Sequence, residues 1–175
     1  MDTVEKEEQL QTLKSDAEQG SATAQFELGK MYFEGDGVTK DEGMAANLLQ
    51  QSMVNGNPLA LKYFQKVAGE GNARFQAQLG WMFYEGKGVD KDYKQAFEWT
   101  RKAVDQEYDV AMVILGMLYF EGHGVETDHI EAYKWYAKAG EKGKKMTAEI
   151  EKVLTPEQIV IWRRRLGPDF LRSKG

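Results

Sequence analysis

The segment Leu79-Gly80-Trp81-Met82-Phe83-Tyr84-Glu85-Gly86-Lys87-Gly88-Val89 decides the fold, because the chain repeats it. Similar segments occupy residues 28–38 and 115–125, and each keeps the initial Leu-Gly, an aromatic pair and the closing Gly-x-Gly-Val. The last two copies are 36 residues apart, and the same offset relates positions further along the chain. Matches at so many positions indicate a tandem structural repeat. The offset pairs Asp92 with Asp128, Ala96 with Ala132, Trp99 with Trp135 and Ala103 with Ala139.

Each copy of the segment predicts a helix and its end. A Leu and an aromatic residue are four positions apart, as in Leu79 and Phe83, which places both on one helical face. The glycine after the Leu removes a side chain where a neighbouring helix packs closely. The Gly-x-Gly that follows ends the helix, because a left-handed C-cap is nearly free of strain only for glycine.

A second helix is predicted after each of these turns. Asp41, Asp92 and Asp128 stand where its N-cap is needed, and Gln95 and Glu131 are placed as reciprocal capping-box partners. We therefore expect an all-α protein without a sheet, an α/α solenoid in which helix-turn-helix repeats form a right-handed superhelix. The expected helices span residues 3–19, 21–34, 41–55, 58–69, 72–85, 92–106, 109–121, 128–142, 145–153 and 156–166. Residues expected in the core are Leu79, Phe83, Trp99, Leu115, Tyr119 and Trp135.

One spacing in the repeat pattern is irregular. The first two Leu-Gly pairs are 51 residues apart, and the extra residues are interpreted as a truncated repeat that has lost its first helix. Two second-type helices then follow one another, which predicts a kink in the superhelix or a gap in its inner wall. The whole chain, residues 1–175, is expected to be a single solenoid. Its parts are an N-terminal helix at 1–20, repeats at 21–56, 72–107 and 108–143, the truncated repeat at 57–71, and a C-terminal cap at 144–175.

The repeat pattern A-x-x-x-L-G-x-x-Y-x-x-G-x-G-V-x-x-D-x-x-x-A-x-x-W-x-x-x-A resembles the Sel-one-like repeat family, which is related to the tetratricopeptide repeats. The resemblance covers roughly residues 15–143. It implies that the first helices of the repeats line a concave wall. The chain departs from the pattern at the truncated repeat and at Phe75, where the other repeats carry Ala24 and Ala111.

The charge distribution limits the classes of partner. The net charge is −5, with −7 on residues 1–57, −2 on residues 58–140 and +4 on residues 141–175. An acidic front and a basic tail argue against a nucleic-acid-binding groove along the body. The cluster Arg163-Arg164-Arg165 is interpreted as a solvated helix face, with a contact to a phosphate or an acidic partner as the alternative.

The composition predicts a cytoplasmic protein that makes no membrane contact. The chain has no run of about eighteen apolar residues, which a membrane span requires. Its first residues are acidic and polar, unlike a signal peptide. Cysteine is absent, which excludes disulfides and thiolate metal sites.

The sequence predicts no catalytic, cofactor-binding or metal-binding residues, and so a protein that is not an enzyme. The Gly-x-Gly loops end helices and follow no strand, which favours a structural role over phosphate binding. His123 and His129 are the only histidines and are interpreted as solvent-exposed polar residues rather than metal ligands. Neither a Ser-x-x-Lys nor a Gly-x-Ser-x-Gly motif supplies a nucleophile.

A binding face is predicted where large apolar residues occupy positions that the repeat does not need for packing. Trp81 and Met117 directly follow the Leu-Gly pairs, and Val113 and Ile114 lie one turn before Met117. Apolar patches of this kind usually mark interfaces. The alternative is that these side chains pack between adjacent first helices or beneath the C-terminal cap. The predicted partner-binding residues are Trp81, Met117, Phe26, Lys30, Gln78, Val113 and Ile114.

Two functions remain open from the sequence. One is an adaptor or scaffold that binds a protein partner through the concave surface. The other is an immunity protein that neutralises a bacterial toxin, in which an acidic front would mask a basic enzyme surface. The sequence indicates neither the identity of the partner nor the oligomeric state.

Overall fold

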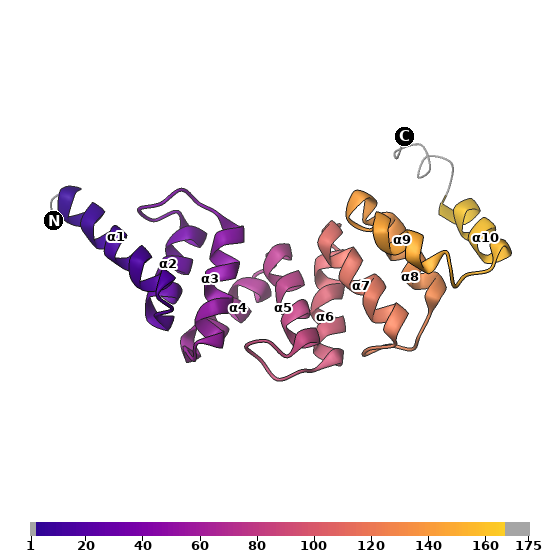
Figure 1. Ribbon diagram of the computed structural model, residues 1–175, viewed down its shortest axis with the longest axis horizontal. Helices are drawn as coiled ribbons and strands as arrows, with labels where there is room; N and C mark the ends of the chain where they lie inside the picture. The colour runs from indigo at the N-terminus through magenta and orange to yellow at the C-terminus, as the bar shows by residue number, and fades with distance from the viewer. Residues whose placement is uncertain (1–2, 167–175) are drawn as a thin grey trace.

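The computed structural model describes residues 3–166, and those residues form ten α-helices and one 3₁₀ turn without any strand. Figure 1 shows the helices in one elongated row, with α1 at one end and α10 at the other. The predicted all-α solenoid is confirmed. The helices are α1 (Thr3–Glu18), α2 (Ala22–Glu34), α3 (Glu42–Val54), α4 (Pro58–Gly69), α5 (Ala73–Glu85), α6 (Tyr93–Val104), α7 (Asp109–Glu121), α8 (His129–Lys138), η1 (Gly140–Lys142), α9 (Lys144–Ile150) and α10 (Pro156–Leu166).

Eight α-helices have bounds within two residues of those predicted, and α8 and α9 differ more. The sequence predicts that α8 continues to residue 142, but it ends at Lys138 because Gly140 takes a positive φ of 64° and begins a 3₁₀ turn. Helix α9 ends at Ile150 rather than residue 153, and a turn follows in which the Val153 N–H donates to the Ile150 carbonyl. Both differences arise from local backbone turns near the C-terminal cap.

The predicted helix ends are confirmed at the glycine loops. Gly35, Gly86 and Gly122 cap α2, α5 and α7 with φ values of 77°, 73° and 72°, a left-handed conformation that favours glycine. Asp92 caps α6, its carboxylate accepting hydrogen bonds from the backbone N–H groups of Lys94 and Gln95.

The predicted capping box is wrong in one of its two hydrogen bonds. The backbone N–H of the capping aspartate is expected to donate to the side chain of Gln95 or Glu131, and at both sites it donates elsewhere. The backbone N–H of Asp92 donates to the carbonyl of Phe83 at 2.9 Å, and the side-chain oxygen of Gln95 accepts from the Trp99 indole at 3.1 Å. At the second site the Asp128 N–H donates to the Tyr119 carbonyl at 2.9 Å. The preceding helix therefore supplies the acceptor that the capping box would have provided, and this bond joins the two helices of each repeat.

The glycine after each Leu allows the two helices of a repeat to approach closely, as predicted. A Cβ atom on Gly80 would overlap the Thr100 hydroxyl oxygen and would lie 3.1 Å from the Ala96 carbonyl oxygen, a contact tighter than a methyl group normally makes. At the matching positions, the Leu49 side chain covers Gly29 and the Tyr136 ring covers Gly116.

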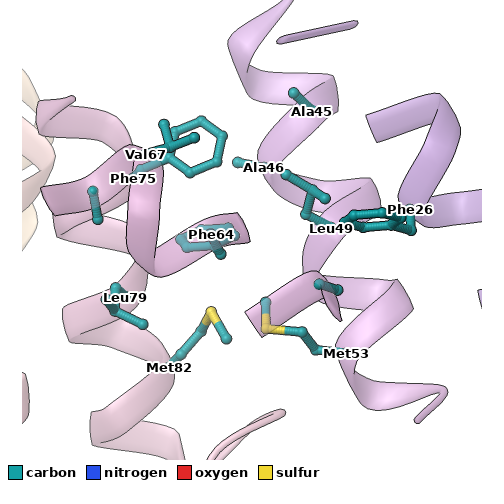
Figure 2. Packing of buried hydrophobic residues seen from close by; sticks show 12 residues of the cluster. Phe26, Ala45, Ala46, Leu49, Met53, Phe64, Val67, Phe75, Leu79 and Met82 are labelled. Atoms are coloured by element: carbon teal, nitrogen blue, oxygen red, sulfur yellow. The ribbon is translucent and has the colours of Figure 1, made fainter. Parts of the chain in front are cut away.

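The segment interpreted as a truncated repeat forms the single helix α4, which packs against both α3 and α5. Phe64 of α4 and Phe75 of α5 are both fully buried, with ring centroids 4.5 Å apart. Figure 2 shows Phe64 between the side chains of α3, such as Leu49, and those of α5, such as Leu79. Phe75, which stands where other repeats have alanine, therefore fills space beside the helix that lacks a partner.

The unpaired helix reverses the direction in which the following repeats run. Figure 1 shows the loop between α2 and α3 at the upper edge of the row, and the loops α5–α6 and α7–α8 at the lower edge. Since one helix rather than a pair separates α3 from α5, these two helices and α7 run in the same direction. Helices α3 and α5 contact each other directly, as α5 and α7 do. A second-type helix, α3, thus lies next to the first helix of the following repeat, α5.

The core prediction is confirmed for two residues and wrong for four. Leu79 and Leu115 are fully buried, and so are Met82 and Leu118, which the sequence did not single out. The four aromatic residues pack against the edge of the core, where long basic side chains cover some of them. The Lys102 ammonium, for example, lies 3.8 Å from the centroid of the Trp99 indole. The half-buried residues are Phe83, Trp99, Tyr119 and Trp135.

We predict that Leu115→Ala lowers the free energy of unfolding by about 2–5 kcal/mol, because the truncation leaves a cavity in a close-packed core. Urea denaturation followed by circular dichroism measures this change. The matched control is Val160→Ala on α10, where the side chain is 51% exposed and the expected change is within about 0.5 kcal/mol. Equal stability of Leu115→Ala and the unchanged protein would contradict the assigned core.

Candidate protein-binding groove

A groove of about 480 Å³ lies across the three helices that run in the same direction. Each helix contributes one face, with residues spaced as positions i, i+3 and i+4, and on α5 and α7 also i+7. The 3₁₀ turn η1 closes one end. We call this feature the groove. Its lining residues are Gly43, Ala46 and Asn47 of α3; Arg74, Ala77, Gln78 and Trp81 of α5; Tyr108, Val110, Val113, Ile114 and Met117 at and within α7; and Lys142 of η1.

The groove is deep where its residues are small and apolar. Ala46 and Ala77 are each 2% exposed and form the floor, and Ile114 is 6% exposed beside them. Trp81 and Met117 are half-buried, so part of each large side chain faces the groove. The lining therefore combines small residues that create depth with two large residues that offer apolar contact area.

The orientation of Trp81 is fixed by a neighbouring tyrosine. Its ring stacks on that of Tyr84, with centroids 5.1 Å apart and planes 19° from parallel. The Tyr84 hydroxyl donates to the Glu121 carboxylate at the end of α7. Burial, together with the hydrogen bond to Glu121, raises the pKa of Tyr84 well above its usual range, so the phenol remains a donor. These contacts connect two consecutive repeats directly behind the indole.

A histidine completes this connection. His123 stacks on Tyr93 with centroids 3.9 Å apart and planes 3° from parallel, and its Nδ1 lies 3.0 Å from the Glu121 carboxylate. Sequence reasoning missed this cluster, although a signal was available. A glutamate precedes the first glycine of every Gly-x-Gly loop, and in the first repeat the equivalent Glu34 accepts a hydrogen bond from the Tyr63 hydroxyl at 3.0 Å.

The opposite end of the groove carries an arginine. Arg74 is exposed in the first turn of α5, and its guanidinium lies over Gly43. A nearby acid, Glu42, has both carboxylate oxygens engaged: one accepts from the Asn72 amide at 3.0 Å and the other lies 3.2 Å from the Lys40 ammonium. The hydrogen bond from Asn72, which outweighs the opposing effect of burial, holds the pKa of Glu42 below its usual value, and the nearby charges of Lys40 and Arg74 add to this effect.

A lysine lies at the same end but is compensated. The Lys142 ammonium is 2.8 Å from each carboxylate oxygen of Asp109, the first residue of α7. Between the two ends, the Gln78 amide donates to the side-chain oxygen of Gln50 on α3 at 2.8 Å. The groove thus changes along its length from a cationic end at Arg74 to an apolar end at Trp81 and Met117.

The structure brings together five of the seven residues predicted to bind a partner. Trp81, Met117, Gln78, Val113 and Ile114 all line the groove.

The other two predicted residues lie elsewhere, because α3 rather than α2 is next to α5. Phe26 is 8% exposed in the core, where it packs edge-on against Tyr63 with centroids 5.9 Å apart. Lys30 lies over the Phe26 ring and pairs with Glu27 at 3.3 Å. Of the basic cluster at 163–165, the side chain of Arg164 is exposed, and the other two side chains lie outside the described residues.

Sequence reasoning missed the contribution of α3 and the ends of the groove. The missed lining residues are Gly43, Ala46, Asn47, Arg74, Ala77, Tyr108, Val110 and Lys142. Two further observations concern other kinds of site. Within residues 3–166 no group of three or more His, Asp or Glu side chains could hold a metal ion. No helix in the same range is both long enough and apolar enough to cross a membrane.

Comparison with known proteins identifies the repeat. The family model for the Sel1 repeat matches residues 22–52, 73–108 and 109–144, which together make up more than half of the chain. The chain belongs to the Sel1 repeat family. Sel1 repeat proteins generally act as protein-interaction modules. The three matches coincide with the helix pairs α2–α3, α5–α6 and α7–α8, and α4 lies between the first two of them.

Two solved structures resemble this Sel1 repeat protein. One is c5321, a protective antigen present in uropathogenic Escherichia coli strains that displays an SLR fold, with 30% sequence identity and a TM-score of 0.58. The match covers 93% of this chain but 40% of that one, so the chain spans less than half the length of this relative. The other is a Sel1 repeat protein from Oxalobacter formigenes, which is 35% identical, with a TM-score of 0.45 and coverage of 81% of this chain and 98% of that chain.

We predict that Glu42→Gln destabilises the protein at neutral pH, because it removes a carboxylate that Asn72 and Lys40 stabilise in the folded state. A folded-state pKa below the unfolded value contributes stability above the unfolded pKa of about 4.3, and this contribution is lost as the pH falls through the folded value. The difference in melting temperature between the variant and the unchanged protein should therefore shrink below about pH 4.3.

The matched control is Glu98→Gln on α6, which removes an exposed carboxylate that forms no ion pair within the described part of the chain. This substitution should leave the melting temperature almost unchanged. If Glu42→Gln retains the stability of the unchanged protein at pH 7, the Glu42 contacts do not stabilise the fold.

Proposed function

We propose that this protein is an adaptor or scaffold that binds a protein partner in the groove, and that it is not an enzyme. The main observation in support is the position of Trp81 and Met117. Both are large, half-buried apolar side chains that line the groove, whose floor is formed by small residues. A side chain of the partner could fill the space over Ala46 and Ala77 without displacing anything in the described chain. A cytoplasmic location remains a prediction from the composition.

The proposal rests on how binding free energy is distributed over the residues of an interface. A few aromatic and large apolar residues in desolvated pockets usually contribute most of the binding free energy, and tryptophan is prominent among them. The Trp81 indole is held in place by its stack on Tyr84, whose hydroxyl is bonded to Glu121. A side chain that is already ordered loses little conformational entropy on binding, which favours affinity.

The second candidate is an immunity protein that neutralises a basic toxin, and the acidic front supports it. Residues 1–57 carry eleven acidic and four basic residues. Exposed acids of α1 and α2, such as Glu8, Asp16 and Glu27, would attract a basic enzyme over a distance. In this alternative the acidic front, rather than the groove, would form the main contact.

Site-specific photo-crosslinking tests which surface binds the partner. A benzoyl-phenylalanine placed at Met117 samples the groove, one at Asp16 samples the acidic front, and one at Glu98 on α6 samples neither. Crosslinking is performed in the native host and the adducts are identified by mass spectrometry. A protein that crosslinks from Met117 alone supports the groove, and one that crosslinks from Asp16 alone supports the immunity alternative.

With a crosslinked partner purified, we predict that Trp81→Ala weakens binding by about 2 kcal/mol or more, the usual scale of an interface hot spot, with little loss of folding stability. Isothermal titration calorimetry and thermal melting measure the two quantities. Trp99→Ala is the matched control, since it removes another half-buried indole that lies outside the groove. Trp81 is only a packing residue if its substitution unfolds the protein or leaves the affinity unchanged.

The acidic front leads to a kinetic prediction for a basic partner. The association rate constant should fall as salt is raised, because screening shortens the range of electrostatic attraction. Stopped-flow measurements at several salt concentrations give this dependence. The double substitution Glu8→Gln and Asp16→Asn should flatten it, whereas a rate that does not depend on salt would exclude steering by the acidic front.

A further inference from the structure

The two ends of the groove differ in chemistry and are separated by a known length of helix. Arg74 and Trp81 are seven positions apart on α5, which corresponds to about 10 Å of helical rise. The α7 residues Val110 and Met117 have the same spacing and lie beside them. Because α3, α5 and α7 run in the same direction, their N-terminal ends, which carry partial positive charge, all lie at the Arg74 end.

Arg74 stands where a cation is unfavourable for the helix itself. It is the second residue of α5, and the positive end of a helix dipole disfavours a basic side chain there. Its guanidinium forms no ion pair or hydrogen bond with any other residue in the range 3–166 that the structure describes. Glu42 is engaged by Asn72 and Lys40, and Asp41 caps α3 through the backbone of Gly43 and Met44. Arg74 therefore has no ion-pair or hydrogen-bond partner among the described residues, although its charge helps to lower the pKa of the nearby Glu42 carboxyl.

The rest of the groove does not supply the missing anion. None of its lining residues is acidic. Lys142 is neutralised by Asp109 through two contacts of 2.8 Å. Among the residues that line the groove, Arg74 is therefore the cation that has no contact ion pair, although the chain as a whole has a net charge of −5.

We infer that the groove selects a partner segment that presents a carboxylate to Arg74 and a bulky apolar side chain to Trp81 and Met117. This inference rests on the proposed function and adds the chemistry and the direction of the bound segment. A guanidinium forms two parallel hydrogen bonds with a carboxylate, a geometry that orients the ligand as well as attracting it. A basic side chain at the same place would meet the Arg74 guanidinium, which is repulsive.

The distance between the two contacts predicts a sequence spacing in the partner. About 10 Å corresponds to roughly three residues of an extended peptide or about seven residues of an α-helix. The acidic front does not conflict with this expectation. The field of residues 1–57 acts over the whole surface during approach, whereas Arg74 acts on the one group that reaches the end of the groove.

Peptide selection tests the inference without knowledge of the natural partner. The full-length protein is used to select binders from a random dodecapeptide library displayed on phage, in parallel with Arg74→Gln, Arg101→Gln and Trp81→Ala. Arg101 is the matched control, an exposed arginine on α6 outside the groove whose guanidinium lies over the Phe97 ring. Selected peptides are synthesised with their acidic residue intact or replaced by its amide, and dissociation constants are measured by fluorescence polarisation.

The expected result is enrichment of an acidic residue about three or about seven positions from a large apolar residue. Arg74→Gln should weaken binding of the acidic peptides about tenfold, as for the loss of one charge-assisted contact. The amide peptides should bind the unchanged protein and Arg74→Gln alike. Arg101→Gln should bind both kinds of peptide as the unchanged protein does.

Two contrary outcomes separate this inference from the proposed function. Peptides that lose affinity on Trp81→Ala but show no preference for an acid, or that prefer a base, would overturn the inference and leave the groove as a binding site. Equal affinity of acidic peptides for Arg74→Gln and Arg101→Gln would overturn it as well. If no selected peptide depends on Trp81, the groove itself is not a peptide-binding surface and both conclusions fail.

Discussion

The arrangement of the whole protein depends on the packing of one helix that has no partner. In a solenoid of helix pairs, each pair returns the chain to its starting direction, so equivalent helices of all repeats run the same way. Helix α4 breaks this rule, and it is held in place by the contact between Phe64 and Phe75, two rings that are fully buried. Because α4 packs against both α3 and α5, the chain continues past the single helix with its direction reversed.

The reversal determines which residues can form a binding surface. It places α3 beside α5 and in the same direction as α5 and α7, so Gly43 and Ala46 fall into register with Arg74 and Ala77 on the next helix. The small residues on α3 make the groove deep, and the Trp81 side chain lines the same groove. Had the missing helix been present, the face of α3 that now lines the groove would not adjoin α5 in this way.

Local signals in the sequence predicted the elements well, and non-local geometry explains what they missed. The glycine loops, aspartate caps and helix bounds depend on a few neighbouring residues, and all ten α-helices were anticipated. Trp81 and Met117 were found because they depart from the repeat pattern. Phe26 was misplaced because its position relative to Trp81 depends on how an unpaired helix packs, which no pattern within one repeat encodes. The burial of Trp99 was overestimated for a related reason: periodicity identifies the inward face of a helix but does not show how far each position on that face lies from the neighbouring helices.

Stability and binding make different demands on the same helix, and Arg74 is where they conflict. Most helix termini in this chain follow the rules that stabilise helices, with Asp41, Asp92 and Asp128 at N-caps and glycines at left-handed C-caps. Arg74 in the first turn of α5 departs from these rules, as Lys94 does in the first turn of α6, but Arg74 also lies at the end of the groove and forms no ion pair within residues 3–166. Sites that break local rules without compensation inside the fold are expected where function is located. The compensation for Arg74 is therefore to be sought in a bound partner, and the groove that begins at its guanidinium leads directly to the ordered indole of Trp81.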